Sequence, residues 1–191
     1  DLYDWDKKAR ELSGLQEMEY CIEPKFDGAS ISLLYEHDQL ARSATRGDGV
    51  QGDDITTNSK QIRNIPLSAA FSSFGIDTIE IRGEVLMSKN SFAAFNGTLT
   101  EEGLPPLANP RNAAAGFLYH VSFIIPQQNS LQNADAQPMP ATHAAMLQML
   151  WNCGFRSPVK EMKIVSGIDA VITHCAWYET QRDALPYEID G

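Results

Sequence analysis

The stretch EYCIEPKFDGASISLLYEHDQLARSATRG, residues 19–47, carries most of the fold information in this chain. Apolar side chains occupy every second position from Ile31 to Tyr35, and this period of two predicts a half-buried β-strand. The triplet His-Asp-Gln that follows predicts a hairpin turn into a second strand, LARSATR. The stretch therefore predicts an antiparallel pair of strands, preceded by a short strand at EYCI.

Lys25 lies inside this stretch, between a proline and a phenylalanine, and Asp27 and Gly28 follow it. A lysine that acts as a nucleophile must be unprotonated, although its ordinary pKa is about 10.4, so it needs burial or a neighbouring cation. Its place at the end of an apolar strand, braced by Pro24, predicts partial burial. Asp27 can orient the lysine or help to hold a metal, and Gly28 can let a phosphate approach. These residues alone leave open a surface lysine followed by an ordinary turn.

The rest of the chain is predicted to form helices and a few further strands. Capping residues and helical spacing predict helices over 1–14, 54–65, 88–103, 142–154 and 166–185, and a small-residue helical stretch at the end of 104–118. Strands are predicted over 76–87 and 121–125, and a last strand begins within 186–191. Adjacent strand pairs with irregularly spaced helices favour an α+β fold with antiparallel sheets.

Composition limits the class of protein. The 191 residues suit one core, and the net charge of −10 counts against a self-sufficient nucleic-acid binder. The chain has no run of eighteen apolar residues and no signal-peptide pattern, which predicts no contact with a membrane. Its three cysteines, Cys21, Cys153 and Cys175, are dispersed, which favours a reducing cytosol over a disulfide framework or a zinc site.

Three further motifs are candidates for chemistry, and each has an ordinary alternative. The glycine-rich segment TRGDGVQGDD, 45–54, can bring its backbone close to a ligand, or it is a flexible acidic loop. Arg82 and Glu84 share one face of a strand, where they can contact a ligand or form an exposed ion pair. In ANPRNAAAG, 108–116, Arg111 can present its planar fork to a phosphate, or it lies on the surface of an alanine-rich helix.

Five motifs of this chain follow one another in an order that resembles the adenylation (nucleotidyltransferase) domain of bacterial NAD-dependent DNA ligases. They are EPKFDG, TRGDGVQGDDIT, IRGEV, ANPRNAAAG and PYEIDG. KFDG matches the K-x-D-G motif of covalent nucleotidyltransferases in general, whereas the second and fourth motifs are specific to the NAD-dependent branch. The resemblance implies an ATP-grasp-like nucleotidyltransferase fold of the α+β class, with two antiparallel sheets flanking a nucleotide cleft. It covers residues 1–191 as the core of that domain, and it implies that the N-terminal nicotinamide-recognition domain and the C-terminal DNA-binding domains are absent from this chain.

The resemblance also implies a reaction. The lysine of KFDG attacks the α-phosphate of NAD, expels nicotinamide mononucleotide and carries AMP, which passes to the 5′-phosphate of a DNA nick before the 3′-hydroxyl seals the strand. Mg²⁺ is expected to neutralise charge on the phosphate oxygens. The implied partners are NAD, AMP and nicked double-stranded DNA, bound mainly through the absent domains, and a cytoplasmic monomer is expected.

The site residues implied by the resemblance come from five segments. The catalytic residues are Lys25 and Asp27, and no metal ligand is assigned. Glu23 is expected at the adenine amino group, Arg46 and Glu84 near the ribose, and Arg111 at the phosphates or the leaving group. Arg182 is expected to support phosphate or DNA contact, and Asp190 to lie at the rim of the pocket.

Two departures from the family pattern limit the expected activity. After Gly116 the chain is about ten residues shorter than typical loop and turn lengths predict, so either the loop is truly shortened or the printed sequence omits part of it. The family's second arginine is missing in the first case and lies in the omitted part in the second, and Pro126 falls where a tyrosine packs near adenine. The chain stops at Gly191, before a further active-site lysine. We therefore expect AMP binding but little self-adenylation with NAD. The alternatives are an ATP-dependent ligase or capping-type nucleotidyltransferase, and a degenerate, non-catalytic nucleotide- or DNA-binding module.

Overall fold

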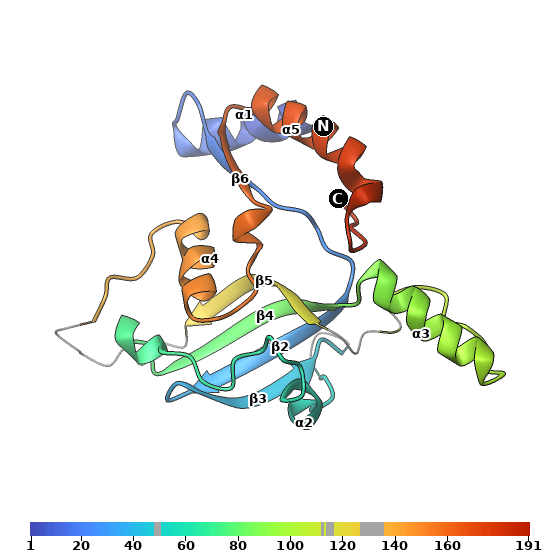
Figure 1. The fold of residues 1–191 in the computed structure, drawn as a ribbon. Helices are drawn as coiled ribbons and strands as arrows, with labels where there is room; N and C mark the ends of the chain where they lie inside the picture. The colour runs from blue at the N-terminus through green and yellow to red at the C-terminus, as the bar shows by residue number, and fades with distance from the viewer. Residues whose placement is uncertain (48–50, 112, 114–116, 127–135) are drawn as a thin grey trace.

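The computed structural model describes residues 1–47, 51–111, 113, 117–126 and 136–191, which form two antiparallel sheets with helices around them (Figure 1). The helices are α1 (Leu2–Ser13), α2 (Thr56–Ser59), α3 (Lys89–Glu101), α4 (His143–Asn152) and α5 (Ile168–Gln181). The strands are β1 (Glu19–Ile22), β2 (Ala29–Glu36), β3 (Gln39–Thr45), β4 (Thr78–Leu86), β5 (Phe117–Pro126) and β6 (Lys163–Ser166).

The larger sheet has the strand order β3-β2-β4-β5, and every neighbouring pair is antiparallel. The smaller sheet pairs β1 with β6, in a register that places Glu19 opposite Ser166. This mixture of helices with two antiparallel sheets confirms the predicted α+β class.

The hairpin between β2 and β3 turns at His37 and Asp38, whose φ angles of 48° and 66° are left-handed. Such a turn matches the twist of the two strands, and Asp tolerates the left-handed region better than most residues. The Asp38 carboxylate also accepts hydrogen bonds from the backbone N–H (2.8 Å) and the hydroxyl of Ser72. The predicted turn is therefore confirmed and is held by a distant segment.

The main core lies between one face of the larger sheet and α4, which Figure 1 shows across that sheet. Tyr35 is completely buried there, with ring centroids 5.4 Å from Phe71 and 5.5 Å from Phe155, both in edge-to-face arrangements. The Tyr35 hydroxyl donates to the carbonyl of Pro66 at 2.5 Å. These contacts fix the β2–β4 pair, whose other face is polar.

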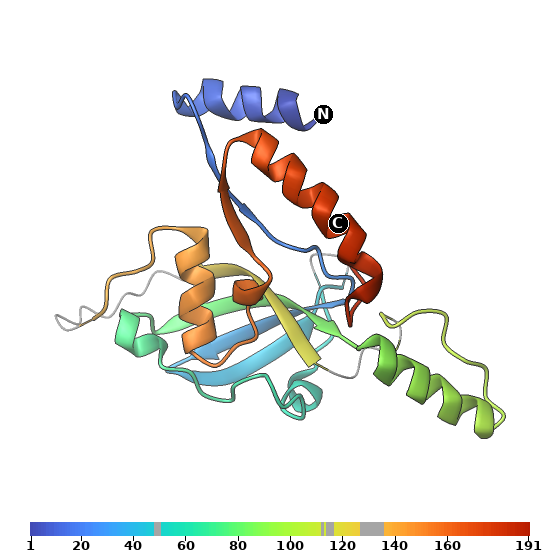
Figure 2. The same cartoon turned by 45° about the horizontal axis from the view of Figure 1, so that its top comes forward.

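The smaller sheet is covered by α1 and α5, and Figure 2 shows β1 and β6 side by side beneath these helices. Asp6 of α1 is 4% exposed, and its carboxylate accepts from the Tyr20 hydroxyl at 2.5 Å and from Arg10 at 2.8 Å. The Tyr20 hydrogen bond holds the pKa of Asp6 below its ordinary value. Tyr3 donates to Asp169 at 2.9 Å, so α1 is joined to both β1 and α5.

Several predicted elements differ from the structure. The predicted helix over 54–65 is helical only over Thr56–Ser59, because Ile62 and Ile65 leave the helix to pack against the core. Residues 117 and 118 begin β5 rather than end a helix, β6 was not predicted, and 186–191 contributes one isolated bridge, between Phe26 and Ile189. Among the described residues, no helix has the length and apolar character needed to cross a membrane.

Candidate active site

The predicted nucleophile lies on an extended segment that joins β1 to β2. The backbone N–H of Lys25 donates to the carbonyl of Gly191 at 2.6 Å, and the Asp190 N–H donates to the carbonyl of Lys25 at 2.7 Å. The Asp27 N–H donates in the same way to Glu188 at 3.0 Å. Two motifs at opposite ends of the sequence, KFDG and EIDG, are thereby held side by side.

A cavity of about 260 Å³ opens beside this segment. Its lining residues come from six segments: the β1–β2 connection, β2, β4, the loop after β3, the loop before β5 and the C-terminal segment. They are Lys25, Phe26, Asp27, Gly28, Ser30, Arg46, Glu84, Arg111 and Asp190. Five of the seven predicted catalytic and nucleotide-binding residues therefore meet in one place, together with Asp190. We call this cavity the lysine pocket.

Lys25 is more exposed than its sequence environment predicted. Its side chain is 70% exposed, and its ammonium group pairs with the carboxylate of Asp190. The prediction of partial burial is wrong, because the segment lies at the open rim of the lysine pocket and the neighbouring carboxylate, rather than an apolar wall, holds the amine. The hydrogen bond from Lys25 lowers the pKa of Asp190.

Asp27 also lines the lysine pocket and holds a second cation. Nη1 of Arg111 is 3.4 Å from Oδ1 of Asp27, and the arginine side chain is 56% exposed. The contact holds Arg111 at the pocket. Asn112 and residues 114–116, the rest of that motif, lie outside the described residues.

Glu84 is the most constrained acid of the pocket. Its Oε1 accepts from the Ser30 hydroxyl at 2.7 Å, whereas its Oε2 is buried and has no hydrogen-bond partner among the described residues. Burial raises the pKa of Glu84. A buried carboxylate oxygen without a donor costs free energy, so this atom marks a position where a hydroxyl or amine of a ligand can donate.

Close backbone packing requires glycine at position 28, and the approach of a phosphate there stays a prediction. A Cβ at this position would lie 2.6 Å from the carbonyl oxygen of Val85 and 2.4 Å from Cδ2 of Leu86. The backbone of the β1–β2 connection therefore packs directly on β4, and this contact sets the distance between Lys25 and Glu84.

The glycine-rich segment after β3 closes on itself. The Thr45 N–H donates to the carbonyl of Asp53 at 3.0 Å, and a Cβ on Gly52 would lie 2.0 Å from the carbonyl oxygen of Thr45. Its Arg46 lines the lysine pocket, and residues 48–50 lie outside the described residues. Glycine is thus needed at position 52 for close contact between the two arms of the loop.

The profile of the family described as "NAD-dependent DNA ligase adenylation domain" matches residues 1–191. The chain belongs to this family. Among its relatives it is similar to the DNA ligase of Persephonella marina, with 47% identity, and to those of Aquifex aeolicus, with 45%, and Pseudomonas aeruginosa, with 40%. These alignments cover 100% of the chain but only 29%, 28% and 26% of the relatives, so the chain spans less than a third of their length. They extend over 208 or 209 positions, more than the 191 residues of this adenylation domain.

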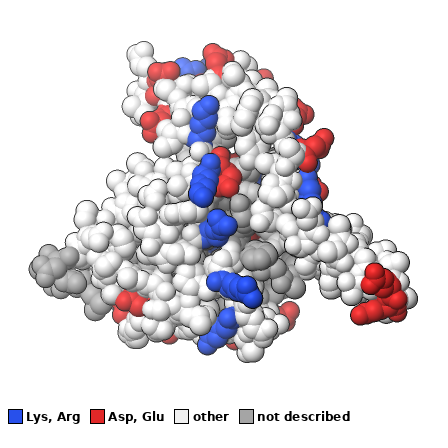
Figure 3. Space-filling view, in the orientation of Figure 1, with Lys and Arg blue, Asp and Glu red and all other residues white. Residues whose placement is uncertain are grey.

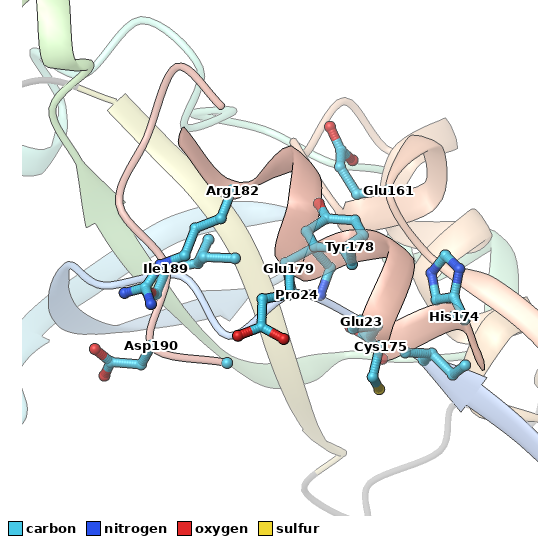
Figure 4. Close-up of a pocket in the computed structure, with 12 residues that line it drawn as sticks. Glu23, Pro24, Glu161, His174, Cys175, Tyr178, Glu179, Arg182, Ile189 and Asp190 are labelled. Atoms are coloured by element: carbon cyan, nitrogen blue, oxygen red, sulfur yellow. The ribbon is translucent and has the colours of Figure 1, made fainter. Parts of the chain in front are cut away.

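A second cavity, of about 330 Å³, holds the two remaining predicted residues of the adenylation domain (Figure 4). Glu23 and Arg182 line it, with Arg182, Ile189 and Asp190 toward one end and His174 and Cys175 toward the other. Nη2 of Arg182 donates to the Ile189 carbonyl at 3.0 Å. Asp190 lines both cavities. We call this cavity the Glu23 pocket.

A wider groove continues from the lysine pocket over the polar face of the larger sheet. It shares Ser30, Arg46 and Glu84 with the pocket and adds Arg42 and Arg82. Arg82 pairs with Glu80 at 2.8 Å, so the alternative of an ion pair with Glu84 is wrong. Figure 3 shows Lys and Arg side chains following one another down the middle of one face, although the adenylation domain has a net charge of −10.

The described residues do not build a metal cage of protein ligands alone. Among them no three His, Cys, Asp or Glu side chains are grouped so as to hold a metal ion. In the lysine pocket, Asp27 and Asp190 already pair with Arg111 and Lys25. Mg²⁺ commonly binds through one or two carboxylates together with substrate phosphates, and the pocket fits that mode only.

Sequence reasoning missed two residues of the site. Ser30 orients Glu84, and Nε2 of His143 lies 2.5 Å from Oε1 of Glu23. Ser30 lies on the polar face of β2, and the alternation of that strand was the available signal. His143 had no such signal, because its partner is 120 residues away.

Proposed function

We propose that this adenylation domain takes AMP from NAD onto Lys25, as the first step of DNA ligation. One observation carries the proposal: Glu84, whose buried Oε2 has no hydrogen-bond partner among the described residues, lines the same 260 Å³ pocket as Lys25 and Arg111. A nucleophile, an acceptor for a ribose hydroxyl and a cation for phosphate are the groups that nucleotidyl transfer to a lysine requires.

In the proposed step the Lys25 amine loses its proton and its nitrogen bonds to the α-phosphorus, while the bond from phosphorus to the oxygen of nicotinamide mononucleotide breaks. Asp190 and Asp27 are the carboxylates near the amine, and Asp190 is the acceptor for its proton because the two groups already pair. Arg111 neutralises phosphate charge, and Arg46, which also lines the pocket, lies near the ribose. Mg²⁺, when bound with the phosphates, would supply further charge neutralisation.

Glu84 and Glu23 hold the nucleoside in this proposal. The free oxygen of Glu84 accepts from a ribose hydroxyl, which removes the cost of leaving it unsatisfied. Glu23 accepts from the amino group of adenine, and Arg182, in the same cavity, supports a phosphate or DNA contact. The two antiparallel sheets would then flank a nucleotide cleft, as in an ATP-grasp-like nucleotidyltransferase fold.

The later steps belong to the whole protein. AMP passes from Lys25 to the 5′-phosphate of nicked double-stranded DNA, and the 3′-hydroxyl displaces it to seal the strand. Because the relatives are more than three times as long as the aligned region, we expect their other domains to bind most of the DNA. We also expect a monomer that works in the cytoplasm.

Intact-mass measurement after incubation with NAD and Mg²⁺ tests the proposal. We expect little adduct on the 191-residue chain, and an adenylyl adduct on the complete natural protein that Lys25→Ala and Lys25→Arg both abolish. Lys89→Arg is the control, because Lys89 also pairs with a carboxylate, Glu188 at 3.8 Å, and neither side chain lines the lysine pocket. Full ligation by the complete Lys25→Ala protein would instead support the non-catalytic module, and adenylation from ATP but not NAD would support an ATP-dependent enzyme.

A further inference from the structure

One contact near Lys25 joins the start of α4 to the segment that carries the nucleophile. The proposed reaction assigns no role to this contact. Nε2 of His143, the first residue of α4, lies 2.5 Å from Oε1 of Glu23, two residues before Lys25. The Glu23 side chain is only 17% exposed, whereas that of His143 is 43% exposed. The contact therefore lies at the edge of the Glu23 pocket, with the carboxylate inside and the imidazole toward solvent.

We propose that His143 is a positioning residue, which fixes the Glu23 carboxylate so that it selects a nucleobase bearing an amino group. The inference rests on the proposed function, in which Glu23 meets adenine. An ionised carboxylate only accepts hydrogen bonds, so the facing Nε2 carries a hydrogen and donates it. Each carboxylate oxygen accepts more than one hydrogen bond, so this contact leaves Glu23 able to accept from a base amine.

Both partners are held by the fold. α4 begins with the Thr142 side chain accepting from the Ala145 N–H at 3.2 Å, and its Leu147 and Leu150 are buried in the protein. The segment that follows Glu23 is fixed by its backbone hydrogen bonds to the C-terminal residues. The imidazole therefore has a defined position relative to Lys25 and can hold the Glu23 side chain in one rotamer.

A fixed acceptor discriminates better than a mobile one. Adenine presents an amino group where hypoxanthine presents a carbonyl oxygen, and a carboxylate attracts the first and repels the second. If Glu23 can rotate away, the binding of adenine has to fix it again, at a cost in side-chain entropy, and the penalty against hypoxanthine falls.

The test compares AMP with inosine monophosphate, which differ at the C6 substituent and at the hydrogen on the adjacent N1, by calorimetric titration of the 191-residue chain. We expect the unaltered chain to prefer AMP, and His143→Ala to weaken AMP binding by roughly fivefold to tenfold, the upper part of the range for a typical hydrogen bond, with inosine monophosphate almost unchanged. His143→Gln, whose amide can still donate, should restore most of the preference. His37→Ala is the matched control, because Nδ1 of His37 lies 2.6 Å from Oδ1 of Asp77 in a similar pair far from the pocket.

A double-mutant cycle separates positioning from support of the fold. In a Glu23→Ala background, His143→Ala should have no further effect on the preference for AMP. An unchanged preference in His143→Ala, or an equal loss of both nucleotides with a lower melting temperature, overturns this inference and leaves the proposed function standing. Failure of the unaltered chain to bind either nucleotide overturns both.

Discussion

Gly28→Ala should destabilise the protein through a contact that no side-chain rotation can relieve. The added Cβ would lie 2.6 Å from the Val85 carbonyl oxygen, 2.4 Å from Cδ2 of Leu86 and 3.3 Å from Cβ of Glu84. The Leu86 methyl group can move, but Val85 contributes backbone in the centre of the larger sheet. Gly28 is not in the left-handed region, so the whole expected effect comes from crowding.

The size of the effect follows from overpacking at a rigid site. Forcing an extra methyl group into a filled position typically costs about 1–3 kcal/mol, and a backbone obstacle places Gly28→Ala near the upper end. For a chain of this size each kcal/mol lowers the melting temperature by about 2–4 °C, so we expect a decrease of roughly 4–10 °C. AMP binding should weaken as well, since the connection that carries Lys25 must move away from β4 and Glu84.

Thermal unfolding followed by circular dichroism measures this prediction, with Gly97→Ala as the matched control. Gly97 lies inside α3, and among the described residues no atom outside its own helical backbone and chain neighbours would lie within 4 Å of a Cβ added there. The same substitution at this position should stabilise the protein by about 0.5–1 kcal/mol, because alanine favours a helix over glycine. Equal melting temperatures for Gly28→Ala and the unaltered chain would show that the connection does not pack on β4 as described.

Three further substitutions test the core and two acids, Glu84 and Asp6, whose pKa values are shifted. Tyr35→Phe leaves the Pro66 carbonyl without its donor and should cost about 1–2 kcal/mol in urea unfolding. Burial raises the pKa of Glu84, so its contribution to stability is complete below the ordinary value of 4.5 and is lost as pH rises through the higher folded value. Glu84→Gln should therefore melt above the unaltered chain at neutral pH, with the difference closing below pH 4.5. The Tyr20 hydrogen bond lowers the pKa of Asp6, so Asp6→Asn should lower the melting temperature at neutral pH, and this loss should shrink as pH falls below 3.8.

Local signals predicted the parts of the fold that local chemistry determines. The alternation in β2, the left-handed turn at His37 and Asp38, and the helix caps at Ser88 and Thr142 all depend on neighbours within a few residues. Elements that depend on distant partners were predicted less well. β6 has four residues and forms because β1, far away in the sequence, pairs with it, so no periodicity could reveal it.

The site was predictable to the extent that its residues lie in recognisable motifs. Lys25, Asp27, Glu84 and Arg111 were expected from their order along the chain, and the structure brings them into one pocket. The exposure of the lysine was not predictable, because it depends on which segment covers the rim. The sequence also could not show that Asp190 lines both the Lys25 and the Glu23 cavities.

That position of Asp190 gives binding and activation a common step. A nucleotide whose base reaches Glu23 and whose phosphate reaches Lys25 must pass Asp190, which lines both cavities and pairs with the lysine. We infer that the phosphate reaches the amine against the repulsion of this carboxylate, and that the repulsion ends when Asp190 takes the proton of Lys25. Asp190→Asn should then bind AMP roughly twofold to fivefold more tightly, because no ionised carboxylate opposes the phosphate at this position, an effect of the size of an exposed ion pair. A calorimetric titration at constant ionic strength measures this change, and weaker binding would mean that Asp190 is itself a contact for the nucleotide.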